Sequence, residues 1–398
     1  MISDSNMKED NSRGGEDATR EAGLAPLREQ IDAVDARLLE AYRERRQIVA
    51  AIATAKGEAN RPVRDRAREV EKLHAHPEEA PLLRTLMRLS RAQQYHQRYE
   101  SGARFPIGEE IATAAEALPP IHAVTTQGDL NSYGAAAARE LFPEAQIMPL
   151  RTFVSACRQV VDDNVKVAVL PLENSSSGIV HEVYDLLTRH RLYIVGQVAM
   201  EIQHRLLGLP GTRLGDIRRV ISHPQALAQC STIIQGMGWQ IEESQNTAFA
   251  ARSVAERGDN QLAALASADA GRSHGLVVLS DEVANVADNQ TLFVAVARRP
   301  VIVPEASRVS LLLSLPHQAG SLAELLATFA DLNLNLSRIQ SLPVPKRPWQ
   351  YSFYIDIDVP ARDEAMLEAL YQLSLELPSL RFLGWYPVRT VLDWQQRD

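Results

Sequence analysis

The first hundred residues carry a helical pattern of apolar positions. From Leu27 to Lys56 there is neither proline nor glycine, and apolar residues recur at spacings of three and four, as on one face of an α-helix. These positions are Leu27, Ile31, Val34, Leu38, Leu39, Tyr42, Ile48, Val49 and Ile52. The helix would be about 45 Å long. Since it cannot bury such a long stripe on itself, we expect it to pair with a second chain.

Two shorter helices are expected to follow. The sequence GEANRP breaks the first helix, and Pro62 suits the first turn of a second helix over 63–74. HPEEAP is another break, and a third helix is expected over 82–99. Residues 1–24 are polar and lack the apolar core of a signal peptide, so they predict a disordered tail.

From about Ile121, short β-rich runs alternate with helical stretches, which is typical of an α/β domain. The runs are IHAVTT, KVAVLPL, LYIVGQV, RRVISH and FVAVARR, and helices are expected over 132–141, 180–189, 226–236 and 248–258. The length of this region suits one domain of two lobes. RRPVIVPEAS, with its two prolines, is interpreted as a linker.

The last segment, from about Arg308, predicts the order βαββαβ, which is the ferredoxin-like pattern. The fold class is therefore a multidomain chain with an all-α part, a two-lobed α/β part and an α+β part. The expected divisions are a tail over 1–24 and domains over 25–100, 120–300 and 307–390.

Composition narrows the function without naming it. The chain has 398 residues, of which 45% are hydrophobic and 23% charged, as in ordinary globular proteins. A net charge of −8 gives no support for a nucleic-acid or membrane partner, so an anionic substrate must meet local cations. Cys157 and Cys230 offer no disulfide framework or zinc spacing, which predicts a cytoplasmic protein without a metal site. No apolar run approaches the roughly 18 residues of a membrane span.

Polar residues of the helical part recur at spacings that place them on shared faces. Arg45 and Lys56 are 11 residues apart, so they share one face of the first helix. Arg28 precedes Arg45 by 17 residues and lies about 100° away around that helix, so it cannot easily serve the same pocket within one chain. Two further sets have spacings of three and four: Asp65 with Arg68 and Glu69, and Ser90 with Gln94.

With these residues, LREQIDAVDARLLEAYRERRQIVAAIATAK…NRPVRDRAREVEKL resembles the helical chorismate mutase family over residues 25–99. The resemblance implies an intertwined homodimer in which Arg28 reaches into the partner chain's site. It also implies a pericyclic reaction that needs no cofactor. Arginines would hold the two carboxylates of chorismate, and Lys56 and Gln94 would stabilise charge on the ether oxygen. The matched site residues are Arg28, Arg45, Lys56, Asp65, Arg68, Glu69, Ser90 and Gln94.

The central block resembles prephenate dehydratase through PLENSSSG, VYDLL, SHPQALAQC and NQTLF, in the right order and spacing. That family has two α/β lobes, like a periplasmic binding protein, with the site in the cleft. The resemblance implies that Thr291 protonates the leaving hydroxyl of prephenate, which requires a dry cleft because an alcohol is a weak acid. The expected substrate-binding residues are Asn174, Ser175, Ser176, His223, Gln229 and Thr247.

The block departs from the family's pattern at three places. Leu292 replaces the arginine of a Thr-Arg-Phe motif, Gln197 replaces a glutamate, and a glycine-rich turn keeps only three of its residues over 128–135. The loss of a cation leaves weak activity, an inactive site or a decarboxylation without aromatisation as alternatives. A non-catalytic amino-acid sensor is a further alternative, against which the intact mutase set argues.

The C-terminal segment 308–388 resembles an ACT domain of the phenylalanine-sensing kind. A helix N-terminus after a glycine suits an amino-acid carboxylate, and the expected effector-binding residues are Gly320, Ser321, Leu322, Gln340 and Ser341. Because Gln340 and Leu342 replace a charged pair of the motif, we expect weaker phenylalanine binding; a purely structural module is the alternative. The chain is thus expected to make phenylpyruvate from chorismate through prephenate, as a homodimer or higher homo-oligomer with L-phenylalanine as effector.

Overall fold

The structure is a computed structural model that describes residues 10–59, 61–285, 289–344 and 351–389. The chain forms two compact units, residues 1–103 and 104–398. Expectations for residues 1–9 of the tail, and for Trp349 and Gln350 before a predicted strand, lie outside the described residues. Across the described ranges, no helix combines the length and apolar character needed to cross a membrane.

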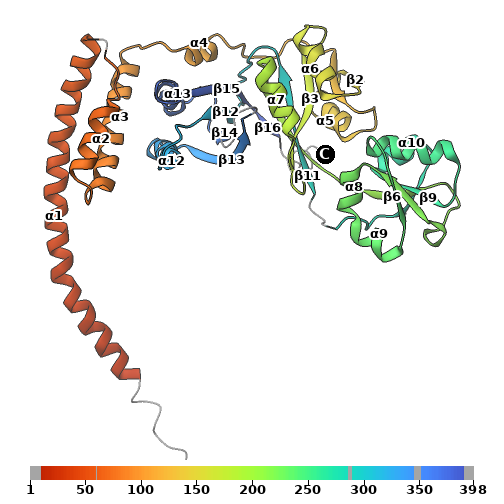
Figure 1. The fold of residues 1–398 in the computed structure, drawn as a ribbon, viewed down its shortest axis with the longest axis horizontal. Helices are drawn as coiled ribbons and strands as arrows, with labels where there is room; N and C mark the ends of the chain where they lie inside the picture. The colour runs from red at the N-terminus through yellow and green to blue at the C-terminus, as the bar shows by residue number, and fades with distance from the viewer. Residues whose placement is uncertain (1–9, 60, 286–288, 345–350, 390–398) are drawn as a thin grey trace, which may run out of the picture. The chain divides into compact units, whose positions relative to one another are not determined.

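The first unit consists of three helices, as the apolar pattern predicts (Figure 1). They are α1 (Asp10–Glu58), α2 (Arg66–Ala75) and α3 (Ala80–Glu100). The helix α1 begins at Asp10, so residues 10–24 are helical where a disordered tail is predicted; each residue added to an existing helix gains a hydrogen bond without a new nucleation cost. The start of α2 also differs, because Asp65 rather than Pro62 marks it: Asp65 Oδ1 accepts a hydrogen bond from Arg68 N at 3.1 Å.

Much of the apolar stripe of α1 is uncovered within one chain. Val49 and Ala53 are buried, since this part of α1 packs on α3. The exposed members, each more than 40% accessible, are Leu24, Leu27, Ile31, Val34, Leu38, Leu39, Ile48 and Ile52. A stripe of this length exposed to water is typical of a helix that has a partner.

The second unit begins with two α/β lobes, each built on its own sheet (Figure 1). The first sheet has the order β16-β5-β11-β3-β1-β2, with β4 on β3, and the second has the order β10-β6-β9-β7-β8. The first-lobe strands are β1 (Ala123–Gln127), β2 (Gln146–Leu150), β3 (Val167–Asn174), β4 (Gly178–Ile179), β5 (Tyr193–Glu201) and β11 (Gln290–Ala297), with α5 (Tyr133–Leu141), α6 (Phe153–Val161) and α7 (His181–His190).

The second lobe lies between β5 and β11 in the sequence, so two segments cross between the lobes. Its strands are β6 (Arg205–Gly208), β7 (Arg219–Ser222), β8 (Gln240–Glu243), β9 (Leu262–Ala266) and β10 (Val277–Ser280). Its helices are α8 (Pro224–Gln229), α9 (Ser231–Met237), α10 (Thr247–Arg257) and α11 (Ala268–Ser273). The helix predicted over 226–236 is therefore two short helices, divided at Cys230.

The C-terminal part has the predicted βαββαβ order and the strand order β13-β14-β12-β15, which is ferredoxin-like. Its elements are β12 (Arg308–Ser314), α12 (Ser321–Asp331), β13 (Asn335–Pro343), β14 (Tyr351–Asp358), α13 (Glu364–Glu376) and β15 (Ser379–Tyr386). Tyr354, Leu342 and Tyr386 share one buried cluster with Leu170 and Leu187 of the first lobe. This sheet is therefore packed onto the α/β part.

The predicted linker is also packed. Val301 and Ile302 are buried, and Ile302 N donates to Ala115 O at 2.8 Å. Just before the first lobe, α4 (Pro106–Ala112) follows Phe105, whose ring meets Tyr371 of α13 at 5.5 Å between centroids. The stretch that contains the two prolines is therefore an ordered part of the second unit rather than a flexible linker.

The C-terminal strands β15 and β16 both lie against β5 of the first lobe, and β15 does so at a glycine. After β15 the chain forms β16 (Val388–Arg389), which pairs in parallel with β5. Gly384 has φ +152°, and a Cβ at this position would lie 2.1 Å from the carbonyl oxygen of Ile194 in β5. The close approach of β15 to β5 therefore depends on the absence of a side chain at Gly384.

Replacing Gly384 with alanine should destabilise the second unit by roughly 2–4 kcal/mol, because the methyl group overlaps backbone atoms that have no room to move. The measurement is the thermal unfolding midpoint of the full chain. Gly215→Ala is the control, since a Cβ added there would meet nothing within 4 Å and the φ of Gly215 is not positive. Equal midpoints for the two variants would contradict the proposed constraint.

Candidate active sites

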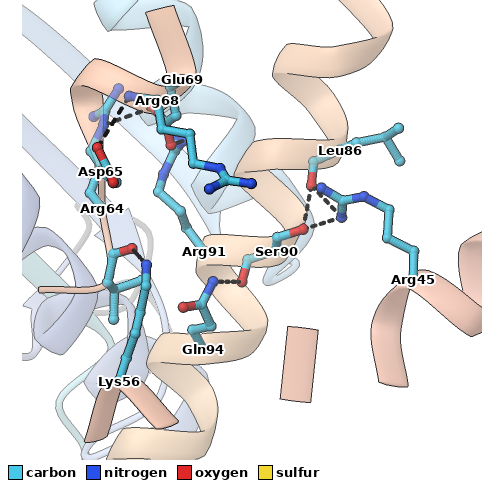
Figure 2. A network of polar contacts seen from close by, with 11 residues as sticks. Arg45, Lys56, Arg64, Asp65, Arg68, Glu69, Leu86, Ser90, Arg91 and Gln94 are labelled. Atoms are coloured by element: carbon cyan, nitrogen blue, oxygen red, sulfur yellow. Dashed lines mark hydrogen bonds and ion pairs between the residues drawn. The ribbon is translucent and has the colours of Figure 1, made fainter. Parts of the chain in front are cut away.

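The first site lies where α1 faces α3 in the helical unit (Figure 2). Arg45 Nη1 donates to Leu86 O at 3.1 Å and to the hydroxyl of Ser90. Gln94 lies one turn further along α3, and its Nε2 donates to Ser90 O at 3.1 Å. Ser90 and Gln94 are buried, and Gln94 Oε1 has no hydrogen-bond partner. The predicted face-sharing of Arg45 with Lys56 and of Ser90 with Gln94 thus brings polar groups to one pocket.

The turn before α2 contributes the opposite wall. Lys56 Nζ donates to Val63 O at 2.5 Å, and Asp65 caps α2, so its position fixes the first turn that carries Arg68. In Figure 2 the guanidinium of Arg68 points toward Ser90. Burial lowers the pKa of Lys56, and burial also lowers the pKa of Arg45. Two partly buried cations at this site would attract a small anion.

Glu69 is held between two arginines, Arg64 and Arg91, neither of which is among the predicted site residues. Its Oε2 pairs with Arg64 Nε at 3.2 Å and its Oε1 with Arg91 Nη1 at 2.6 Å. Arg91 is only 4% exposed, and a buried guanidinium requires such a partner. Its place between Ser90 and Gln94 in the sequence was the available signal. The site therefore has two more cations than predicted, Arg64 and Arg91.

Arg28 is the one matched residue that lies far from this pocket. It is exposed on α1, and seventeen residues of helix place it about 25 Å along the axis from Arg45. A guanidinium cannot span that distance. The structure thus groups Arg45, Lys56, Asp65, Arg68, Glu69, Ser90 and Gln94, and leaves Arg28 apart.

The second site is a cavity of about 480 Å³ lined by both lobes. Among the described residues that line it, none is a lysine or arginine. Four helices of at least nine residues begin at it: α5 after Ser132, α6 at Phe153, α7 after Val180 and α10 after Asn246. The positive ends of these helices supply the attraction for an anion that side-chain cations do not.

Asn174 and Thr291 face this cavity from adjacent strands. Asn174 Nδ2 donates to Thr291 Oγ1 at 2.9 Å, and both residues are buried. Because the threonine oxygen accepts this bond, its own proton is free to be donated into the cavity. Asn174 Oδ1 accepts bonds from Ser177 Oγ at 3.0 Å and Gln229 Nε2 at 3.3 Å. This geometry suits a hydroxyl that acts as a proton donor.

A β-bulge in β3 produces that arrangement. The ladder pairs Phe293 with Pro171 and Leu292 with Glu173, so Leu172 is an extra residue. The bulge turns Asn174 to the face of Thr291 and turns Glu173 to the opposite face, beside Leu292. The arginine expected at position 292 would therefore not have lined the cavity, and its replacement removes no cation from it.

The other two departures from the family pattern, Gln197 and the turn over 128–135, form hydrogen bonds within the fold. Gln197 is buried and accepts a hydrogen bond from Tyr386 of β15 at 3.4 Å, away from the cavity lining. The altered turn is held by its own side chains: Ser132 Oγ accepts from Ala135 N at 3.2 Å, and Asp129 Oδ1 accepts from Asn131 N at 2.8 Å. Polar side chains thus fix the conformation of the turn.

The predicted substrate-binding residues divide into lining and supporting groups. His223, Gln229 and Thr247 line the cavity, as does Asn174. Ser175 and Ser176 instead brace the loop before β11: Ser175 Oγ accepts from Gln290 N, and Ser176 Oγ donates to Asn289 Oδ1, each at 2.9 Å. Of the three successive serines, the one that lines the cavity is Ser177. The tight turn after β3 explains the difference, because successive residues there point in different directions.

Among the cavity residues that were not predicted, two have buried polar atoms without a partner. Thr126 is fully buried and its hydroxyl has no hydrogen-bond partner; His204 has an unpaired Nδ1, while its Nε2 lies 2.9 Å from Gln229 Oε1. Burial lowers the pKa of His204, which keeps its ring neutral. Unpaired buried polar atoms in a cavity indicate ligand contacts. Polar residues inside a β-rich run were the only sequence signal for Thr126.

The predicted effector residues occupy two neighbouring elements. Gly320, with φ +88°, precedes α12, which begins with Ser321 and Leu322. Gln340 and Ser341 are successive residues of β13 and therefore point to opposite faces of the sheet. Leu342 is buried in the cluster shared with the first lobe. The leucine that replaces a charged residue is thus part of the interface with the α/β part.

Three family models match the chain in order. Chorismate mutase type II matches residues 27–95, prephenate dehydratase 124–301 and the ACT domain 309–374. A bifunctional chorismate mutase/prephenate dehydratase of Escherichia coli (strain K12) is 33% identical over 390 residues, which cover 94% of this chain and 98% of the relative. The chain belongs to the bifunctional chorismate mutase/prephenate dehydratase family. This confirms the resemblance seen in the sequence and the three fold classes.

Solved structures match the second unit. The prephenate dehydratase of Arthrobacter aurescens, in complex with L-Phe, has a TM-score of 0.61 and 29% identity, and the match covers 67% of this chain and 90% of that chain. GqqA, described as a novel type of quorum quenching acylase, has a TM-score of 0.60 and 31% identity, with 67% and 98% covered. The same architecture thus occurs in proteins with different described activities.

Because the Thr126 hydroxyl has no hydrogen-bond partner, we can predict how its removal changes the free energy of unfolding in the absence of ligand. Thr126→Val should leave the free energy of unfolding unchanged or raise it by up to about 1 kcal/mol, because no hydrogen bond is lost. Thr125→Val is the matched control: this neighbour is equally buried, but its Oγ1 donates to Ala156 O at 3.3 Å. The control should lose about 1 kcal/mol. Denaturant unfolding measures both, and a larger loss for Thr126→Val would contradict the assignment.

Proposed function

We propose that this chain converts chorismate to prephenate in its helical unit and prephenate to phenylpyruvate in the cleft of its α/β part. The observation that carries the second step is the hydrogen bond between the buried residues Asn174 and Thr291, which leaves the threonine proton free to point into the cavity between the lobes. The first step is supported by the pocket that Arg45, Lys56 and Gln94 form around α3.

In the mutase step the protein binds and stabilises without covalent chemistry. Arg45 and Arg68 hold the carboxylates of chorismate and favour the compact conformer in which the reacting carbons meet. Lys56 keeps two N–H donors beyond its bond to Val63 O. With the amide of Gln94 it stabilises the negative charge that grows on the ether oxygen as the C–O bond breaks. Glu69, fixed by Arg64 and Arg91, accepts a hydrogen bond from the substrate hydroxyl.

The mutase site requires a second chain. A dimer would cover the exposed stripe of α1 and bring Arg28 of one chain to the pocket of the other. The support is the length of the stripe and the distance of about 25 Å between Arg28 and Arg45 in one chain. The occupant of the stripe is therefore a second copy of this chain.

In the dehydratase step, Thr291 protonates the ring hydroxyl of prephenate as CO2 leaves and the ring becomes aromatic. The N-termini of α5 and α10, with Thr126, Ser177 and His223, bind the carboxylates. The neutral lining lets a dianion enter without an ion pair so strong that it would hinder release. Burial around Thr291 supports proton donation by a weak acid, because bulk water cannot compete for the leaving group.

L-Phenylalanine acts as the effector of the ACT domain, bound at Gly320–Leu322 and the adjacent end of β13. The Arthrobacter aurescens relative in complex with L-Phe supports this ligand. The proposed domain limits are 25–100, 120–300 and 307–390. A cytoplasmic location fits the two buried free thiols of Cys157 and Cys230, for which burial raises each pKa to about 12.

Feeding chorismate to the purified full chain should yield prephenate and then phenylpyruvate. Thr291→Val should accumulate prephenate, with phenylpyruvate formation reduced roughly 10²- to 10⁴-fold, the scale of losing a general acid. The rate of chorismate consumption should stay at the wild-type value, since Thr291 belongs to the other unit. Chromatography of the products distinguishes the alternatives: a decarboxylated non-aromatic product indicates a redirected site, and no consumption of prephenate indicates a sensor.

A hybrid dimer tests the shared mutase site. Lys56→Ala should lose roughly 3 kcal/mol of transition-state stabilisation, and Arg28→Ala should be similarly impaired because one carboxylate loses its clamp. Mixing the two variant chains should restore part of the mutase rate, since each hybrid dimer contains one site with both residues. Mass spectrometry of differently labelled chains verifies exchange, and absence of recovery in exchanged dimers would refute the proposal.

A further inference from the structure

The contact between the ACT sheet and the first lobe includes a charged pair beside the dehydratase cavity. Arg338 of β13 reaches Glu173 of β3, with 3.1 Å between Nη1 and Oε2. On its other side Arg338 Nε lies 3.6 Å from Oδ2 of Asp356, a fully buried carboxylate in β14. Both members of the first pair are about three-quarters buried, so water screens their attraction only partly.

Glu173 directly precedes Asn174, and the bulge at Leu172 sends the two side chains to opposite faces of β3. One face meets the ACT domain, and the other carries the hydrogen bond to Thr291. A force applied to the side chain of Glu173 is therefore transmitted through a single peptide unit to Asn174.

The backbone at the end of β3 is paired on both sides: Glu173 and Asn174 face Ile179 and Gly178 of β4, and Leu292 and Thr291 of β11 beyond the bulge. This pairing holds the backbone but leaves the charge of the Glu173 side chain to be met from outside the strand. The opposing residue Leu292 has no charge to pair with Glu173. Arg338 supplies the cation that pairs with this carboxylate, and it belongs to the ACT domain rather than to the dehydratase fold.

We propose that Arg338 is a positioning residue for the dehydratase reaction: its ion pair with Glu173 fixes the end of β3 and, through Asn174, the direction of the Thr291 hydroxyl. The proposal rests on the proposed role of Thr291. The pair would couple the ACT domain to the cleft even without effector. Misplacement of a reacting group by about 1 Å costs on the order of a hundredfold in rate.

The test is a double-mutant cycle in the full-length chain, with prephenate as substrate. Arg338→Met and Glu173→Gln should each lower the dehydratase kcat roughly tenfold to a hundredfold, while KM changes less than about threefold, since the acid acts in the transition state. The double variant should be no slower than the slower single variant, because both changes break the same pair. Arg338→Lys keeps the charge and should recover most of kcat.

Two controls separate positioning from loss of structure. Arg362→Met removes another ion pair of the ACT domain, to Glu116 at 3.6 Å, and should leave kcat within twofold. The mutase rate of each preparation reports the integrity of the first unit, and the unfolding midpoint reports that of the second. If Arg338→Met does not fold, the isosteric Glu173→Gln and the lysine variant carry the test.

Three results would overturn the proposal: an unchanged kcat in Arg338→Met, additive losses in the double variant, or an equal loss in Arg362→Met. Thr291→Val is assayed in parallel. If that variant retains wild-type dehydratase activity, the proposed acid is wrong, and this failure is distinct from the outcome of the Arg338–Glu173 cycle.

Discussion

The β-bulge at Leu172 is the local constraint on which the second unit depends. Without the extra residue, the strict alternation of β3 would place Asn174 on the side of Leu172 and the ACT domain. With it, Asn174 meets Thr291 across the ladder and Glu173 meets Arg338. One inserted residue thus creates the cavity geometry and the contact with the C-terminal domain together, and it does so next to a proline that already weakens the ladder.

The two sites of this chain bind anions by different physical means. The helical pocket concentrates guanidinium and ammonium groups, including the buried Arg91, around a carboxylate that keeps them oriented. The cleft has no such cations among its described lining residues and relies on helix N-termini and unpaired hydroxyls. A rearrangement that needs stabilisation of a growing charge suits the first arrangement, whereas an elimination that needs directed proton donation suits the second. The net charge of −8 indicates neither of these two anion-binding arrangements.

The ACT domain is joined to the α/β part as a structural layer. Tyr354, Leu342 and Tyr386 enter the core of the first lobe, and β16 extends its sheet. Tyr354 and Tyr386 also surround Ser310, whose hydroxyl donates to the buried Asp356 at 2.5 Å. Polar groups buried in this way must keep their partners. A shift of the ACT sheet would therefore displace residues of the lobe that carries Asn174 and Thr291.

The sequence by itself determined the order of the three domains and the ferredoxin-like pattern, because family motifs and periodicity along the chain define them. The mutase residues were predicted from the resemblance to a family, and spacing added which of them share a helix face. Arg45, Lys56, Ser90 and Gln94 share faces that 3.6 residues per turn already define. Tertiary structure decided what spacing does not encode. The bulge reassigned Leu292 from the cavity to the ACT interface, the turn after β3 exchanged Ser176 for Ser177, and the assembled fold left Thr126 without a partner. Each outcome depends on which segments from distant parts of the chain meet, because a side chain's burial and its hydrogen-bond partners exist only after those segments have packed.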